Sequence, residues 1–126
     1  HGGKRLRPIM VLMANDLFDG DLQKVIKPAL AIEFFHNFSL IHDDIMDAAP
    51  LRRGKPTIHT IHGLNVGILS GDGLLIKAYQ FFEDLEPELF KKCVKIQMGL
   101  LNYNGYFRMR NMSFLPSECH VGNDVL

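Results

Sequence analysis

Apolar side chains recur every three or four residues through a long central segment, and this spacing constrains the fold more than any other feature. The recurrence is the period of an α-helix with one buried face. The positions concerned are Val25, Ala29, Ile32, Phe35, Phe38, Ile41 and Ile45. Proline is favoured in a first helical turn, so we expect the main helix to run from about Pro28 to Ala48.

Similar spacing predicts helices over Arg7–Phe18, residues 64–83 and residues 88–101. Residues 48–57 contain two prolines and a glycine, which is typical of a loop. No segment shows a convincing strand pattern, so the predicted class is all-α. Small residues in the helix over 64–83 allow another helix to approach closely. They are Gly67, Gly71 and Gly73.

Composition excludes several classes of function. A chain of 126 residues predicts one domain, and its net charge of zero argues against a nucleic-acid or membrane-surface binder. No apolar run reaches the ~18–20 residues that span a bilayer, so stable membrane insertion is not expected. Two cysteines, Cys93 and Cys119, form no disulfide framework. With no signal peptide apparent, the expected location is the cytoplasm.

Three aspartates lie at the end of the main helix, in the stretch "SLIHDDIMD". Asp43 and Asp47 are four residues apart, so their carboxylates share one face, and His36 lies two turns earlier on nearly the same line. Two like charges at this spacing destabilise a helix unless a cation lies between them. Mg²⁺ suits such a pair, because it commonly uses one or two carboxylates together with substrate phosphates. A solvated acidic face is the alternative that the residues alone leave open.

Two basic clusters flank the acidic stripe. Arg52 and Arg53 open the following loop, and "GGKRLRP" at residues 2–8 supplies Lys4, Arg5 and Arg7 beside two glycines. Arginine binds phosphate through paired donors, and glycine lets backbone N–H groups approach an anion. The combination predicts two bound polyanions, one held through a metal ion and one held directly.

Four motifs, in order and at family spacing, give a specific resemblance. They are "GGKRLRP", "HNFSLIHDDIMD", "LRRGKPTIH" and "ILSGD". Over residues 2–85 the chain resembles a trans-isoprenyl diphosphate synthase of the polyprenyl synthetase family. The resemblance implies an all-α isoprenoid-synthase bundle around an apolar cavity, here truncated. It also implies a prenyltransferase that joins isopentenyl diphosphate to an allylic diphosphate with Mg²⁺ as cofactor.

The resemblance also implies residue roles. Asp43 and Asp47 would be the catalytic metal ligands, and Asp44 would support them or act as an auxiliary ligand. Arg52 would be catalytic and would bind the allylic diphosphate. The residues that would bind isopentenyl diphosphate are Lys4, Arg7, His36 and Arg53.

The implied reaction proceeds by ionisation, condensation and elimination. Apolar walls would keep water from the carbocation, and Phe34 and Phe35 are candidates, although most such rings are expected to be plain core. Phe38 stands five residues before the first aspartate, where the family places a chain-length gate. A bulky side chain there favours a short or medium product.

The sequence also departs from the family pattern. The helix that normally precedes "GGKRLRP" and the second aspartate-rich motif are missing, and residues 102–126 look like foreign sequence. We therefore expect a partial synthase domain over residues 1–101, an atypical tail over 102–126 for which a non-native origin is one interpretation, and negligible activity for this chain alone. Exposed apolar faces predict a homo-oligomer, either a dimer or a swapped assembly.

Two further functions remain alternatives. One is a non-catalytic partner subunit of a heteromeric prenyl synthase, and the other is a helical metal- or phosphate-binding module unrelated to prenyl transfer. Two other pairs are interpreted as structural. His59 and His62 lack the third ligand that a metal site needs. Cys119 and His120 are neighbours in sequence, but a nucleophile and its base must be neighbours in space. Asp72 of "ILSGD" is expected to pack or hydrogen-bond rather than to bind metal.

Overall fold

The computed structural model describes residues 3–103, with side chains as far as Gly99. The elements in chain order are α1 (Leu6–Leu17), α2 (Leu22–Met46), β1 (Leu51–Arg52), β2 (Lys55–Pro56), α3 (Ile58–His62), α4 (Leu64–Gln80) and α5 (Pro87–Tyr103). The chain divides into two compact units, residues 1–90 and 91–126. All packing described below lies within the first unit.

The predicted all-α class is confirmed, with one small addition. Each strand has only two residues, and the pair forms an antiparallel hairpin inside the segment that the sequence predicts as a loop. The short helix α3 is also absent from the sequence prediction. Asn102 and Tyr103 still belong to α5, and the rest of the predicted tail lies outside the described residues.

Helix α2 begins at Leu22, so the predicted start at Pro28 is wrong. Asp21 caps the helix, since its side chain accepts a hydrogen bond of 2.9 Å from the Gln23 N–H. Pro28 lies inside the helix and cannot donate to the Lys24 carbonyl, yet the helix continues through it. The stronger capping signal therefore fixes the start. The helix ends at Met46, and Ala48 has left-handed backbone with φ 49°.

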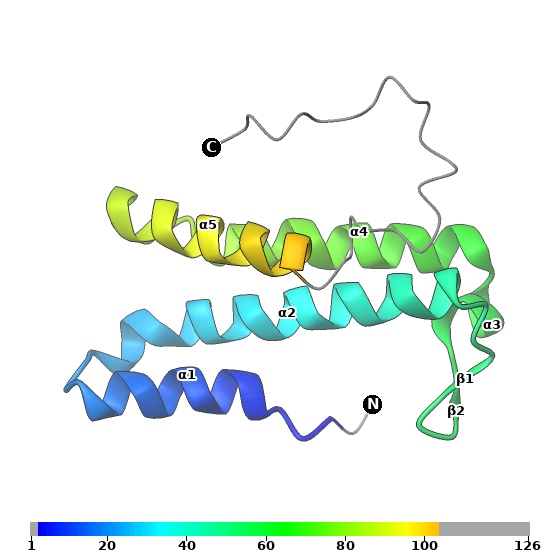
Figure 1. Cartoon of the computed structure of the whole chain (residues 1–126), viewed down its shortest axis with the longest axis horizontal. Helices are drawn as coiled ribbons and strands as arrows, with labels where there is room; N and C mark the ends of the chain where they lie inside the picture. The colour runs from blue at the N-terminus through cyan, green and yellow to red at the C-terminus, as the bar shows by residue number, and fades with distance from the viewer. Residues whose placement is uncertain (1–2, 104–126) are drawn as a thin grey trace. The chain divides into compact units, whose positions relative to one another are not determined.

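Helix α2 lies between α1 and α4, as Figure 1 shows. Aromatic contacts fill the core: the Phe34 and Phe81 rings meet edge to face with centroids 5.0 Å apart, and Phe38 meets His42 at 4.9 Å. Phe38 is only 3% exposed, which favours its interpretation as core. The gate role for Phe38 and the apolar cavity stay predictions.

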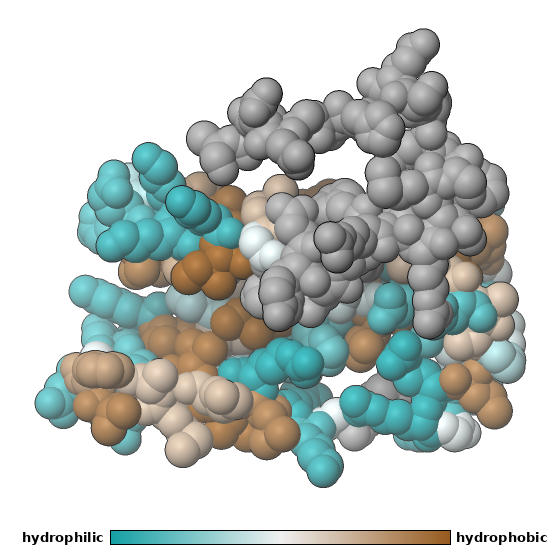
Figure 2. All heavy atoms as spheres, viewed as in Figure 1, coloured by the Kyte–Doolittle hydropathy of each residue, from teal (hydrophilic) through white to brown (hydrophobic). Residues whose placement is uncertain are grey.

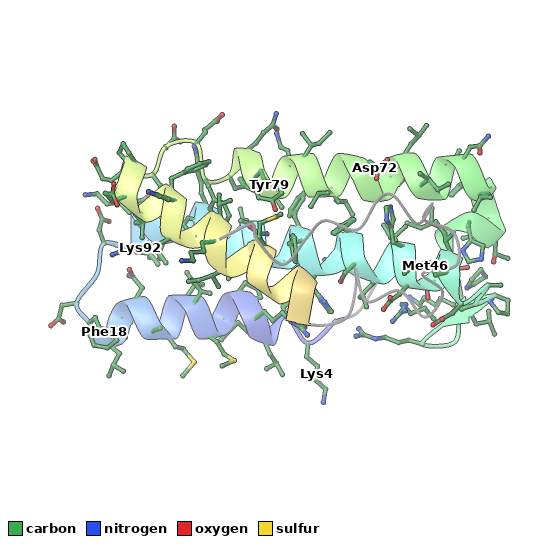
Figure 3. The ribbon with its side chains drawn as sticks, turned by 45° about the horizontal axis from the view of Figure 1, so that its top comes forward. Lys4, Phe18, Met46, Asp72, Tyr79 and Lys92 are labelled. Carbon is green, nitrogen blue, oxygen red and sulfur yellow. The ribbon has the colours of Figure 1, made fainter. Side chains whose placement is uncertain are left out.

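Gly67 and Gly71 bring α4 close to α2, as the sequence predicts, whereas Gly73 has no neighbour within 4 Å and does not take part in this approach. A side-chain methyl at Gly71 would overlap the His42 ring, and one at Gly67 would lie 3.0 Å from Ile45 Cδ1. The ring of His42 therefore sits directly on the backbone of α4. Its Nε2 lies 3.5 Å from Asp72 Oδ1, so "ILSGD" acts in helix packing as expected. Figure 3 shows Asp72 on α4.

Large apolar side chains are exposed along α1 and just after it. Figure 2 shows them gathered at the lower left of the view. They include Leu6, Met10, Met13, Leu17 and Phe18, the last of which is 81% exposed. This apolar face is the observation that supports self-association.

We predict opposite effects for two neighbouring glycines of α4. Gly71→Ala should destabilise the chain by about 1–3 kcal/mol, because the methyl would collide with His42 in a packed interface. Gly73 has open space around it, so Gly73→Ala should stabilise the helix by roughly 0.5–1 kcal/mol. Urea unfolding measures both changes.

A double variant separates the collision from other causes. Adding His42→Ala to Gly71→Ala removes the ring that the methyl would strike, so part of the lost stability should return. If the double variant is no more stable than the sum of the single effects predicts, the collision is not the cause.

Candidate functional site

Three carboxylates gather at the C-terminal end of α2. The Asp47 N–H donates to the Asp43 carbonyl at 2.9 Å, so the two residues keep the i, i+4 relation through the end of the helix. Both are exposed, whereas Asp44 is buried. A helix C-terminus carries partial negative charge, and the last turn of α2 contains no basic residue. Its electrostatics therefore favour a bound cation or a basic partner.

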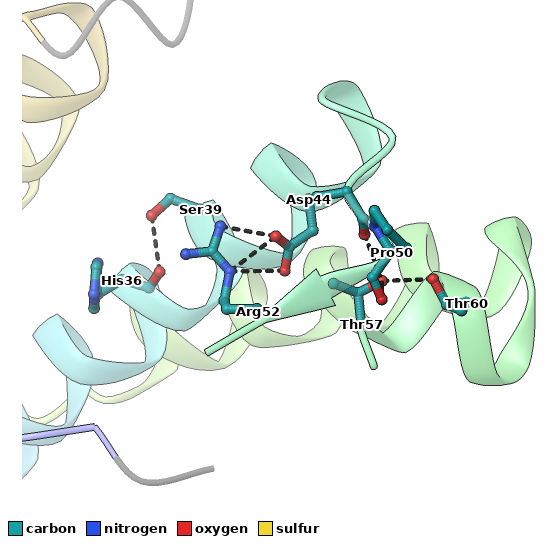
Figure 4. A network of polar contacts seen from close by, with 8 residues as sticks. His36, Ser39, Asp44, Pro50, Arg52, Thr57 and Thr60 are labelled. Atoms are coloured by element: carbon teal, nitrogen blue, oxygen red, sulfur yellow. Dashed lines mark hydrogen bonds and ion pairs between the residues drawn. The ribbon is translucent and has the colours of Figure 1, made fainter. Parts of the chain in front are cut away.

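Asp44 has such a partner in Arg52. Arg52 Nε donates to both carboxylate oxygens of Asp44 at 2.8 Å, and Nη2 lies 2.8 Å from Oδ1. The Asp44 side chain is only 10% exposed. Figure 4 shows this ion pair joining the hairpin to the helix. The hydrogen bond to Asp44 raises the pKa of Arg52 further, with smaller contributions from the charges of Asp43 and Asp47, so the guanidinium stays charged.

The hairpin places two adjacent arginines in different surroundings. Arg52 pairs with Lys55 across the strands, and Arg53 with Gly54 forms the two-residue turn. Both turn residues have positive φ, 53° and 75°. Such turns normally use Asn, Asp or Gly at the first position, so arginine is disfavoured there. Arg53 nevertheless adopts this unfavourable backbone conformation, and residues with strained backbone are often found at functional sites.

Thr57 closes the loop that carries the hairpin. Its hydroxyl donates to the Ala49 carbonyl at 2.8 Å, and its N–H donates to the Pro50 carbonyl at 3.1 Å. Thr57 is 3% exposed, and its hydroxyl also lies 2.8 Å from that of Thr60 (Figure 4). The sequence pattern does not predict a role for Thr57. Its position directly after the turn-forming Gly-Lys-Pro is the only local signal.

A second basic group forms around His36. Burial lowers the pKa of His36, followed by the positive charge of Arg7, while Glu33 opposes the shift and Arg53 and Arg52 add to it. Arg7, Arg53 and Arg52 therefore all lie within electrostatic range of His36.

The N-terminal segment joins this second basic group through its backbone. A Cβ atom at Gly3 would lie 3.4 Å from Arg53 Nη1, so the backbone at Gly3 is next to this guanidinium. Arg5 precedes α1 with φ 49°, a second left-handed arginine. Lys4 is exposed and points away from the helices in Figure 3, so the structure does not place it with the others.

The acidic pair fits a magnesium ion whose remaining ligands are water and oxygen atoms of a substrate. No group of three or more potential metal-binding side chains converges within residues 3–99. Asp43 and Asp47 supply two hard oxygen donors, while Asp44 is occupied by Arg52. Two carboxylates are too few for a closed protein site, but Mg²⁺ commonly completes its shell with water and phosphate oxygens.

Other candidates from the sequence give no second site. Burial raises the pKa of the Cys93 thiol, which disfavours the reactive thiolate. His59 and His62 lie on the short helix α3. Cys119 and His120 lie outside the described residues. Within the described part of the chain, no helix is long and apolar enough to cross a membrane.

Comparison with known proteins decides the family. The model of the polyprenyl synthetase family matches residues 1–103. The chain belongs to this family. It is 40% identical over 117 residues to geranylgeranyl diphosphate synthase of Saccharolobus solfataricus, covering 90% of this chain and 35% of that protein. It is 41% identical over 99 residues to farnesyl diphosphate synthase of Geobacillus stearothermophilus, covering 77% and 33%.

Solved structures agree with the family assignment and confirm the isoprenoid-synthase type of fold. Geranylgeranyl pyrophosphate synthetase from Pyrococcus horikoshii matches with a TM-score of 0.75 and 44% identity over 85% of this chain and 34% of that one. Geranyltranstransferase from Thermotoga maritima matches with a TM-score of 0.78 and 35% identity, over 88% and 44%. The chain spans about a third of the length of the curated relatives that it matches.

We predict that His36 is neutral in the folded chain at pH 7 and titrates below the ordinary histidine pKa of about 6.5. As the pH falls below that value, the unfolded chain binds a proton that the folded chain resists, so His36 lowers stability on acidification. Histidine NMR titration, assigned with His36→Gln, measures the pKa. That variant should lose less stability between pH 7 and pH 5. A folded-state pKa at or above 6.5 would contradict the prediction.

Proposed function

We propose that this chain contributes to head-to-tail prenyl transfer, in which isopentenyl diphosphate adds to an allylic diphosphate. One observation carries the proposal: a single hairpin carries Arg52, which is bonded to Asp44 at the acidic end of α2, and Arg53, whose guanidinium lies beside Gly3 and whose charge acts on His36. Two separate anion-binding groups then lie close enough to bring two diphosphates together. Relatives named as geranylgeranyl and farnesyl diphosphate synthases support the same reaction class.

The allylic diphosphate belongs with the acidic group in this proposal. Asp43 and Asp47 would hold Mg²⁺, because their exposed carboxylates lie one turn apart at the end of α2. When bound, Mg²⁺ neutralises charge on the diphosphate leaving group. Arg52, which stays charged beside Asp44, donates to the same diphosphate and favours its departure.

Isopentenyl diphosphate belongs with the second basic group. Arg7, His36 and Arg53 supply donors and positive charge, and Gly3 lies beside the Arg53 guanidinium. The charges of Arg7 and Arg53 that lower the pKa of His36 would be offset by a bound diphosphate. Lys4 joins this group by family resemblance alone.

Bond changes follow from this placement. The allylic C–O bond breaks, and its electron pair leaves with the diphosphate. The double bond of isopentenyl diphosphate then attacks the allylic cation, and the adjacent carbon loses a proton to the departing diphosphate. Proximity of the two anions supplies the orientation that this step needs. Aromatic side chains on α2, including Phe35, exclude water from the cation.

We predict Mg²⁺-dependent binding of inorganic pyrophosphate, measured by calorimetry. Asp43→Asn and Asp47→Asn should each weaken it roughly tenfold or more, because each removes a charged contact. Asp16→Asn, at an exposed aspartate of α1, is the matched control and should have no effect. Pyrophosphate binding that does not depend on Mg²⁺ or on these aspartates would refute the assignment of the acidic pair.

A condensation assay with labelled isopentenyl diphosphate and geranyl diphosphate extends this binding test. The sequence contains a single D-D-x-x-D motif, so we expect negligible product from the chain alone. Product above background would contradict that expectation. Product that appears only after a catalytic synthase subunit is added would favour the partner-subunit alternative.

We predict that Arg53→Asn separates stability from binding. Asparagine tolerates the left-handed backbone of the turn better than arginine, so the variant should be as stable as the parent or up to about 1 kcal/mol more stable. It should bind isopentenyl diphosphate more weakly, because a positive charge is lost beside His36. Thermal unfolding and calorimetry measure the two effects. Unchanged affinity would remove Arg53 from the proposed site.

A further inference from the structure

We propose that Asp44 is a positioning residue for Arg52 and not a metal ligand. It holds one edge of the guanidinium so that the remaining donors face the diphosphate bound through Asp43 and Asp47. This inference rests on the proposed function, because it assigns a role within the same anion site. It also resolves the sequence-based alternatives for the middle aspartate of the motif.

The Asp44 carboxylate is already bonded to Arg52. Both oxygens of Asp44 accept a hydrogen bond from Arg52 Nε at 2.8 Å, and Oδ1 also lies 2.8 Å from Nη2. Metal ligation by Asp44 would compete with these bonds. It would also remove the close anionic partner of Arg52, whose side chain is 36% exposed. Loss of one member of a partly buried ion pair is costly.

Burial separates Asp44 from its two neighbours. The Asp44 side chain is 10% exposed, whereas Asp43 and Asp47 are exposed on successive turns. Adjacent helical residues point about 100° apart, so Asp43 and Asp44 cannot share one direction. The motif therefore divides into an outer pair that faces solvent and an inner carboxylate that faces the hairpin.

The free edge of the guanidinium supplies the link to the diphosphate. Arg52 uses Nε and Nη2 on Asp44, and Figure 4 shows the third nitrogen, Nη1, pointing away from that carboxylate. Asp43 and Asp47 lie near enough for their charges to act on Arg52. When one edge of a guanidinium is already hydrogen-bonded, the arginine side chain loses little further conformational freedom on binding an anion at another edge.

Binding of inorganic pyrophosphate with Mg²⁺ tests the role. We expect Asp44→Asn to weaken pyrophosphate affinity roughly tenfold, as loss of a charged hydrogen-bond partner commonly does. Arg52→Gln should weaken it at least as much. The double variant should be no worse than Arg52→Gln alone, because Asp44 acts only through Arg52. Asp16→Asn again serves as the unaffected control.

A second measurement separates positioning from metal ligation. The Mg²⁺ concentration that gives half-maximal pyrophosphate binding should be unchanged in Asp44→Asn but raised in Asp43→Asn. All titrations are made at a temperature where circular dichroism shows each variant folded. Should Asp44→Asn fail to fold, Arg52→Lys takes its place, since lysine keeps the charge but lacks the fork that grips Asp44. It should lose affinity in the same way.

Three results would overturn the inference. Parental affinity in Asp44→Asn, or in Arg52→Lys where that variant is used, would show that the ion pair does not position Arg52. A raised Mg²⁺ requirement in Asp44→Asn would show a metal ligand. Additive losses in the double variant would show independent roles. If the parent chain itself binds no pyrophosphate, the proposed function fails and this inference fails with it, whereas any of the three results leaves the proposed function standing.

Discussion

The ion pair between Asp44 and Arg52 is the contact on which the arrangement of the site depends. A carboxylate that is buried at the negative end of a helix is stable only with a charged partner. Arg52 satisfies this need and thereby fixes β1 against the last turn of α2. Thr57 fastens the other end of the same loop to the carbonyls of Ala49 and Pro50. The hairpin is thus held at two points, and Arg53 is carried with it.

Helix packing sets the direction of the acidic pair. His42 immediately precedes Asp43, and its ring rests on the backbone of α4 at Gly71. Because neighbouring helical side chains diverge, seating His42 against α4 turns Asp43 toward solvent. The core contact and the proposed metal ligand are therefore adjacent in sequence but face different surroundings. The same helix carries His36 two turns earlier, which relates the second basic group to the first through one rigid element.

Sequence patterns predict most of the helical framework and the acidic pair, since both follow from spacing along one helix. The start of α2 is missed because Pro28 looks like a first-turn residue, whereas the capping by Asp21 is the stronger signal. The hairpin is missed because Arg53 occupies a turn position where Asn or Gly is usual. The partner of Asp44 cannot be found by spacing, because the contact depends on how the loop folds back onto the helix.

The connection from the end of α2 to the hairpin also sets a limit on how this segment can change in length. In a hairpin, a shift of one residue moves every side chain to the opposite face. A single insertion or deletion between Asp44 and Arg52 would shift β1 by one residue, leave Asp44 without its partner and change where the charge of Arg53 lies relative to His36. Point substitutions in this loop alter one contact at a time. A change of length would displace Arg52 and Arg53 together, so the spacing between the acidic motif and Thr57 is as much a part of the proposed site as the residues themselves.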